Sequence, residues 1–239
     1  MNRPLACSVL ALATLLGGGA LLLFGCFVVF GAIPLRRLPL SDAQVLLWDG
    51  ALSMLFFVQH SGMVRRPFRA WLARRVPEVF HAAAYAIASG AVLAAVVLLW
   101  QPSTTIIVEV GGLWRWLLRG MALFGVAGVL WGVMAFRDFD PFGRQPIRAA
   151  LAGRPNPSPC FVVRGPYRWV RHPLYFFTLI LLWAMPDLSL DRLLFNVLWS
   201  VWIVLGAYLE ERDLVADFGE EYRQYQKSVP MLMPWKGRP

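Results

Sequence analysis

The chain has 239 residues, of which 58% are hydrophobic and 15% charged, and a soluble domain of that length cannot bury so much apolar sequence. The formal net charge is +9, but only two of the cations are lysines and most arginines stand in short segments between apolar runs. That placement is typical of membrane orientation and argues against nucleic-acid binding. The composition therefore predicts an integral membrane protein.

Six apolar runs approach the length of a membrane-spanning helix, which needs roughly 20 residues. They cover residues 5–33, 43–64, 82–100, 117–136, 174–186 and 193–209. The first run is too long for the core of a cleaved signal peptide, so we expect it to be retained as a span. The last two are short and meet at Met185, Pro186 and Asp187, which predicts a tight helical hairpin. We therefore expect an all-α integral membrane protein with five to six transmembrane helices.

Arginine placement predicts the orientation of these spans. Arginines are concentrated in segments 65–75 and 137–171, which the positive-inside rule assigns to the cytosol. Segment 101–112 has no cation and is expected outside. Arg36 and Arg37, in the loop after the first run, oppose this assignment, but the arginines of the two large loops outnumber them.

Beyond the hairpin, apolar residues recur at three- and four-residue spacing. They are Leu214, Phe218, Tyr222, Tyr225 and Val229. The spacing predicts an amphipathic helix that lies on the membrane or caps the bundle. We expect residues 1–136 to form N-terminal transmembrane helices, and residues 137–239 to form one further unit with a cytosolic loop, the hairpin and this helix.

Metal and disulfide chemistry are not expected. Cys7 and Cys26 lie in the first apolar run and Cys160 lies in a proline-rich loop, without a Cys-x-x-Cys pair or a histidine at ligand spacing. Glycines are expected to serve helix packing where they recur within one span, at Gly125, Gly128 and Gly132.

His172 is the first candidate for chemistry. It precedes Pro173, which biases its backbone away from the helix that follows and suits Pro173 to the first helical turn. The imidazole would then project from a loop at the membrane boundary. An ordinary interfacial histidine beside arginines and aromatic residues is the alternative interpretation.

Two adjacent carboxylates, Glu210 and Glu211, follow the apolar run 193–209 directly. They repel each other unless a cation is near, and that cation could be a bound ligand, Arg212 or a loop arginine. Adjacent helical residues diverge by about 100°, so at most one of the pair is expected to point inward.

His60 and Asp49 lie within the apolar run 43–64, where ionisable groups are costly and become site candidates. His60 is close to the end of the run, where it could simply reach the interface. Both residues are weaker candidates than His172.

The string GPYRWVRHPLY (165–175), followed by a hairpin and EERDLVADFGEEYRQYQKSVP (210–230), resembles the membrane methyltransferase superfamily that includes isoprenylcysteine carboxyl methyltransferases and phospholipid methyltransferases. The upstream strings LFFVQHSGMVRRPFRAWLARRVPE (55–78) and FDPFGRQ (139–145) are similar to its bacterial branch of methanethiol S-methyltransferases and NnrU-type membrane proteins. The resemblance implies a multi-pass protein of the bacterial cytoplasmic membrane.

The same resemblance implies S-adenosylmethionine bound at the cytosolic face. The residues that it places around the cofactor are Cys160, Phe161, Val162, Tyr167, His172, Pro173, Leu174, Tyr175 and Glu210. The group that takes the proton from the acceptor remains open between His172, His60 and an ordered water. No Gly-rich dinucleotide-type turn is present in the sequence, which argues against a soluble-type methyltransferase domain.

One departure from the family bears on the acceptor. Carboxyl-methylating relatives carry an arginine four residues before the glutamate, where this chain has Gly206. That arginine would share a helix face with Glu210, so its absence favours a neutral or thiol acceptor.

Three functions remain open from the sequence. The first is S-methylation of a small thiol such as methanethiol to dimethyl sulfide. The second is methylation of a lipidic or isoprenylated acceptor, and the third is an NnrU-like non-enzymatic role in nitrogen-oxide metabolism. The expected partners are a small thiol and the lipid bilayer, with no nucleic acid and no metal, and the oligomeric state is left open.

Overall fold

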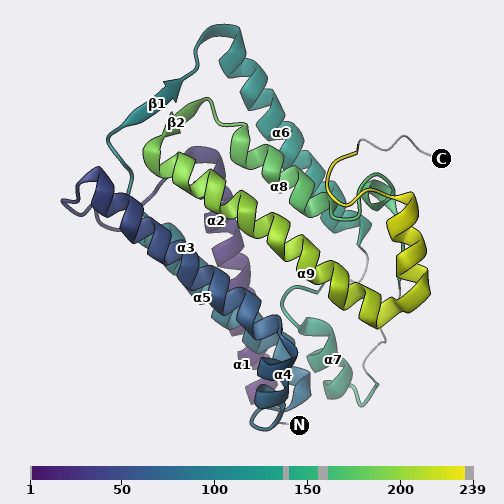
Figure 1. The fold of residues 1–239 in the computed structure, drawn as a ribbon. Helices are drawn as coiled ribbons and strands as arrows, with labels where there is room; N and C mark the ends of the chain where they lie inside the picture. Colours follow the sequence, from purple (N-terminus) through teal and green to yellow (C-terminus); the bar gives the residue numbers. More distant parts are fainter. Residues whose placement is uncertain (1, 137–139, 156–160, 235–239) are drawn as a thin grey trace. The chain divides into compact units, whose positions relative to one another are not determined.

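A computed structural model describes residues 2–136, 140–155 and 161–234, and almost all of its regular structure is helical (Figure 1). Four helical stretches are long and apolar enough to cross a membrane: Arg3–Phe30, Glu78–Leu99, Gly112–Ala135 and Leu190–Ser228. The all-α membrane fold predicted from the sequence is therefore confirmed.

The chain divides into two compact units that interleave in sequence. The first contains Met1–Thr104 and Asp140–Pro159, and the second contains Thr105–Phe139 and Cys160–Pro239. The helix Gly112–Ala135 thus belongs to the same compact unit as the C-terminal hairpin. The expected division into residues 1–136 and residues 137–239 stays a prediction.

The first unit is built around one central helix, α5 (His81–Leu99), which packs against α1, α2 and α3. Gly90 of α5 lies so close to the N-terminal helix that a Cβ there would be 2.7 Å from the Leu16 carbonyl oxygen. The other elements of this unit are α1 (Arg3–Ala13), η1 (Thr14–Gly18), α2 (Gly19–Phe30), α3 (Asp42–Val64), α4 (Arg66–Ala73), η2 (Glu78–Phe80) and α7 (Arg144–Leu151).

Helix α3 has 23 residues and is long enough to span, but it is less apolar than the four stretches above. It begins with a capping box in which Ser41 and Gln44 bond each other's backbone. Its Asp49 is fully buried and accepts a hydrogen bond from the Gln101 backbone at 3.0 Å. Asp49 therefore holds the chain that follows α5.

The second unit contains β1 (Ile106–Glu109), α6 (Gly112–Ala135), η3 (Gly165–Arg168), α8 (Pro173–Trp183), β2 (Asp187–Ser189) and α9 (Leu190–Ser228). The two strands form an antiparallel ribbon, with Ile106 opposite Ser189 and Glu109 opposite Asp187. Arg115 at the start of α6 clamps Asp187 with two hydrogen bonds of 2.9 and 2.5 Å. This ribbon was not predicted from the sequence.

Helices α6 and α8 pack closely through the glycine face of α6. A Cβ at Gly128 would be 2.1 Å from the Phe177 ring, and one at Gly125 would be 2.7 Å from Leu181. Gly132 similarly leaves room for Leu174. The expectation that these glycines serve close packing is confirmed, and the contact fixes α8 against α6.

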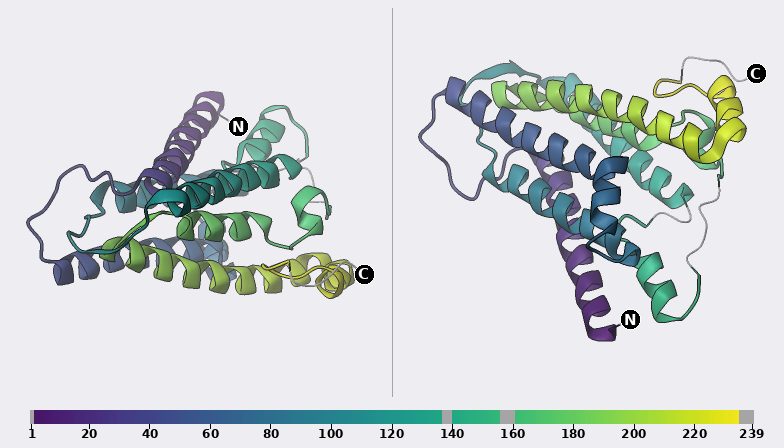
Figure 2. Two further views of the ribbon diagram at one scale, coloured as in Figure 1. Left: turned by 90° about the horizontal axis from the view of Figure 1, so that it is seen from above. Right: turned by 60° about the horizontal axis from the view of Figure 1, so that its bottom comes forward.

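Helices α8 and α9 form the predicted hairpin, but α9 continues far beyond residue 209. It breaks at Gly219, where φ is 59° and ψ is −129°, and the remaining turns reverse direction (Figures 1 and 2). The chain beyond them meets the loop before α8, where the Arg171 and His172 amides donate to the carbonyls of Pro230 and Met231 at 2.9 and 3.1 Å. The segment 220–232, which we call the C-terminal cap, therefore covers that loop.

Candidate functional site

The site is built on the loop that precedes α8. Gly165 has φ of 52°, and a Cβ there would be 2.9 Å from Ala135, so the loop lies tightly against α6. Pro173 opens α8 and His172 directly precedes it with a non-helical backbone. The predicted geometry of His172 and Pro173 is confirmed.

Glu211 is the centre of the polar contacts around this loop. The Arg171 guanidinium donates to both carboxylate oxygens, from Nε at 2.7 Å and from Nη2 at 2.8 Å. His172 Nε2 lies 2.9 Å from the same carboxylate, and Tyr222 and Gln226 of the C-terminal cap also donate to it. We call these five residues the Glu211 cluster.

The Glu211 cluster keeps its carboxylate ionised. Glu211 follows the apolar part of α9 and is 8% exposed, and burial alone would raise its pKa. The hydrogen bonds from His172, Arg171, Gln226 and Tyr222 outweigh burial and hold the pKa of Glu211 well below its usual range. Burial and the neighbouring Glu211 carboxylate raise the pKa of Tyr222, which therefore stays a hydrogen-bond donor.

An ionised carboxylate only accepts hydrogen bonds, so His172 donates to Glu211 from Nε2. The other nitrogen, Nδ1, lies 3.6 Å from Glu210 Oε2. The backbone of His172 is also fixed by its hydrogen bond to Met231. The cluster therefore fixes both a proton on Nε2 and the orientation of the ring.

Glu210 has different surroundings from its neighbour. Its side chain is 46% exposed, and the Tyr175 hydroxyl donates to it at 2.8 Å. The Tyr175 ring stacks on His172 with centroids 5.4 Å apart. Within the described part of the chain, no arginine or lysine forms an ion pair with Glu210.

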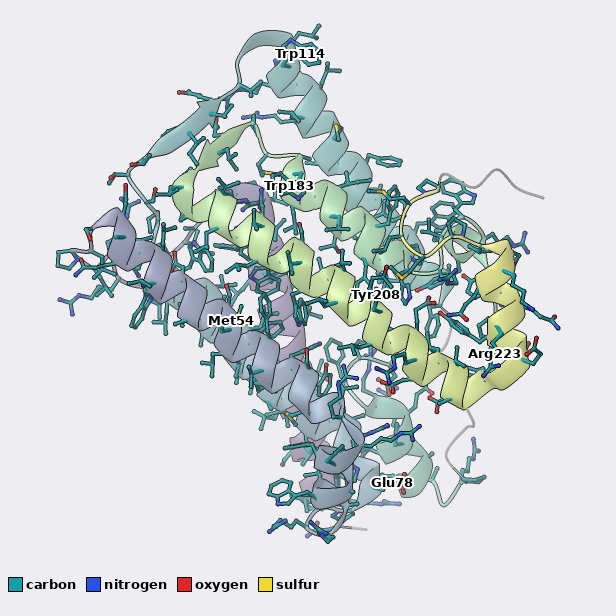
Figure 3. All side chains as sticks on the ribbon, viewed as in Figure 1. Met54, Glu78, Trp114, Trp183, Tyr208 and Arg223 are labelled. Atoms are coloured by element: carbon teal, nitrogen blue, oxygen red, sulfur yellow. The ribbon has the colours of Figure 1, made fainter. Side chains whose placement is uncertain are left out.

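The two glutamates thus take opposite roles, as their divergence on a helix predicts. A loop arginine neutralises the buried Glu211, which was one alternative open from the sequence, and that arginine is Arg171 rather than Arg212. The Glu210 carboxylate remains accessible. Figure 3 shows nitrogen- and oxygen-bearing side chains gathered between the labelled Tyr208 of α9 and Arg223 of the C-terminal cap.

Tyr167 joins the site from the same loop. Burial, and second the nearby Glu210 carboxylate, raise the pKa of Tyr167 to about 12. Its backbone carbonyl accepts a hydrogen bond from the Tyr225 hydroxyl, and its ring lies 5.8 Å from that of Phe136. Tyr167 is therefore a neutral phenol held between α6 and the C-terminal cap.

The segment before the loop contributes one packed and one exposed residue. The Phe161 ring packs on Phe218, Tyr222 and Tyr225 with centroids 5.4 to 5.7 Å apart, whereas Val162 is 43% exposed. Cys160, the third residue expected there, lies outside the described residues.

His60 belongs to the first unit, like Asp49 and in contrast to the residues around the Glu211 cluster. A ring nitrogen lies 2.7 Å from the Tyr85 hydroxyl, and the ring packs 5.0 Å from Phe56. These contacts link α3 to α5. A role for His60 in proton transfer stays a prediction.

Sequence reasoning missed Tyr222 and Gln226 as members of the site. Tyr222 was assigned to the apolar face of the predicted amphipathic helix, where spacing alone gives no polar partner, and Gln226 was not singled out. Gly219 was the available signal, because a break there is what lets residues 11 and 15 positions after Glu211 return to it.

Comparison with known proteins identifies relatives over most of the chain. No family model matches, and no solved structure matches. A methanethiol S-methyltransferase of a Pseudomonas species is 40% identical over 189 residues, which cover 79% of this chain and 73% of that protein. The enzymes of the same name from Pseudomonas deceptionensis and Bradyrhizobium diazoefficiens are 36% and 33% identical, over 79% and 82% of this chain and 72% and 69% of those proteins. The chain therefore belongs to the methanethiol S-methyltransferase family.

Proposed function

We propose that this protein transfers a methyl group from S-adenosylmethionine to methanethiol and so forms dimethyl sulfide. The observation that carries the proposal is Glu210, a half-exposed carboxylate held by Tyr175 at the edge of the Glu211 cluster. The family supports the reaction class, because its curated members carry that activity in their names.

The described residues suit this cofactor. S-adenosylmethionine supplies an electrophilic methyl group on a positively charged sulfur, and it carries an ammonium group as well. A carboxylate without an arginine or lysine partner among the described residues is a fitting contact for such a cation, and the ring of Tyr175 adds an aromatic face beside it. We assign the cofactor contacts to Phe161, Val162, Tyr167, His172, Pro173, Leu174, Tyr175 and Glu210.

The protein's own contribution is to orient the His172 ring and to accept the proton of the thiol. Arg171 and Glu211 hold the His172 ring with its proton on Nε2, which leaves Nδ1 as an acceptor beside Glu210. A thiol must lose its proton to become a strong nucleophile, and Nδ1 can take it, since Glu210 at 3.6 Å would stabilise the imidazolium. His60 is the second candidate for this proton.

The acceptor pocket would lack a cation where carboxyl-methylating relatives have one. Gly206 lies one helical turn before Glu210, and a Cβ there would meet nothing within 4 Å. A neutral thiol needs no such cation. We place the site at the cytosolic face, because the arginine-rich segments lie on that side by the positive-inside rule.

The first test is S-adenosylmethionine binding to the detergent-purified Glu210→Ala variant by calorimetry. Removal of a charged hydrogen-bond partner should cost about 1.5–3 kcal/mol, or roughly tenfold to a hundredfold in affinity. The matched control is Glu221→Ala, because Glu221 is exposed on the C-terminal cap. Unchanged affinity in Glu210→Ala would remove Glu210 from the cofactor site.

A lipidic acceptor is distinguished by the product. Supplied with short thiols and with lipid amines in parallel, the protein should methylate the thiols. Methylation of the lipid alone would show that the acceptor is lipidic and not a small thiol.

A further inference from the structure

A cavity of about 930 Å³ opens within the first unit, and none of the residues that line it is assigned to the cofactor. Its walls come from the end of α3, from α4 and η2, from the start of α5 and from α7 with the residues after it. Leu72, Val79 and Ala150 give it apolar walls, and Tyr85 contributes a hydroxyl that is bonded to His60. Methanethiol has only two heavy atoms, so the cavity has the volume of a much larger ligand.

The charged residues at the cavity favour an anion. Arg69 and Arg154 both line it, together with Glu78, which is labelled in Figure 3. Among the described residues, neither arginine has an ion-pair partner. The lining therefore carries one more positive charge than negative, and two guanidinium groups remain for an anionic ligand.

Helix α4 has the features of a helix at the lipid headgroup level. It follows α3 directly and precedes α5, which is long and apolar enough to span. The Arg75 guanidinium lies 4.4 Å over the Trp71 ring, and Phe68 packs 5.3 Å from the same ring. Aromatic residues beside arginines at the end of a span are typical of the membrane interface.

Arginines, apolar walls and an interfacial position together match one class of molecule. We propose that the cavity binds an anionic glycerophospholipid, with its phosphate at Arg69 and Arg154 and the start of its acyl chains against Leu72 and Val79. Basic pockets between transmembrane helices recognise lipid headgroups through this combination. Met63 and Val64 at the end of α3 add further apolar lining for the chains.

The test is native mass spectrometry of the delipidated full-length protein with phosphatidylglycerol or phosphatidylcholine added. The wild-type protein should retain phosphatidylglycerol selectively. The double variant Arg69→Ala/Arg154→Ala should bind it roughly tenfold more weakly or worse, since two cations near the headgroup are lost. The control Arg66→Ala/Arg148→Ala removes the same charge from exposed positions of α4 and α7 outside the cavity lining and should retain the lipid.

A second variant tests the space in the cavity without changing the charge of its lining. Ala150→Trp leaves both arginines and places an indole ring in part of the cavity, so it should also reduce lipid retention. Equal uptake of the two lipids by the wild-type protein would contradict the proposal without any variant. Equal lipid retention by Arg69→Ala/Arg154→Ala and by its control Arg66→Ala/Arg148→Ala would also overturn it. Displacement of the lipid by millimolar glycerol phosphate would overturn it as well, because the site would then belong to a soluble anion.

Discussion

At the scale of single residues, the two adjacent glutamates divide structural and binding roles. Glu211 is buried and satisfied by Arg171, His172, Tyr222 and Gln226, whereas Glu210 is half exposed and bonded to Tyr175. The sequence predicted that the pair would diverge, because neighbours on a helix point about 100° apart. It could not predict which one faces inward, since that depends on where the C-terminal cap folds.

Glu211→Gln should destabilise the protein strongly. The substitution leaves Arg171 buried without its carboxylate, and breaking a buried pair costs about 3–5 kcal/mol. The apparent melting temperature in detergent should therefore fall by several degrees. Glu220→Gln is the control, because Glu220 is exposed and lies 3.8 Å from the exposed Lys227. Equal melting of both variants would contradict a central role for Glu211.

The stabilisation by Glu211 should persist into mildly acidic solution. Because folding lowers its pKa below the usual value of 4.5, the contribution is present above that value and is lost as the pH falls through the lower folded pKa. The difference in melting temperature between the wild-type protein and Glu211→Gln should stay constant from about pH 8 to about pH 5.5 and narrow below about pH 4. A difference that already narrows between pH 7 and pH 6 would show that the carboxylate is not held ionised.

At the scale of elements, apolar runs and prolines predicted the helices well. The hairpin of α8 and α9 and the close packing of α6 with α8 follow from Met185, Pro186 and the α6 glycines. The ribbon of β1 and β2 was missed because each strand has only three or four residues and its partner is distant in the chain. The break of α9 was missed because a single glycine is tolerated within a helical pattern.

Gly219→Ala should loosen the C-terminal cap. A side chain at φ of 59° and ψ of −129° is strained by about 1–3 kcal/mol, and relief of that strain would straighten α9 and withdraw Tyr222 and Gln226 from Glu211. Hydrogen exchange should show faster exchange in the cap and in the loop before α8. Gly206→Ala is the control, because Gly206 lies within α9 and a Cβ there meets nothing within 4 Å. Unchanged exchange in Gly219→Ala would contradict the role of the break.

At the scale of the whole molecule, composition was sufficient for the membrane class but not for the organisation of the helices. Four stretches have the length and apolarity of spans, whereas α3 carries Asp49 and His60 and α8 has only 11 residues. Helix α6 belongs with the C-terminal hairpin because its glycine face accepts Phe177 and Leu181 of α8. Such a contact depends on side-chain shape across distant segments, which apolar periodicity does not encode.

The central claim is that this membrane protein methylates methanethiol with S-adenosylmethionine. The most direct measurement supplies both compounds to the detergent-purified protein and follows dimethyl sulfide in the headspace by gas chromatography. The claim predicts dimethyl sulfide that depends on protein and on both substrates, with formation reduced in Glu210→Ala and retained in Glu221→Ala. Protein that binds S-adenosylmethionine but forms no dimethyl sulfide from methanethiol would contradict it.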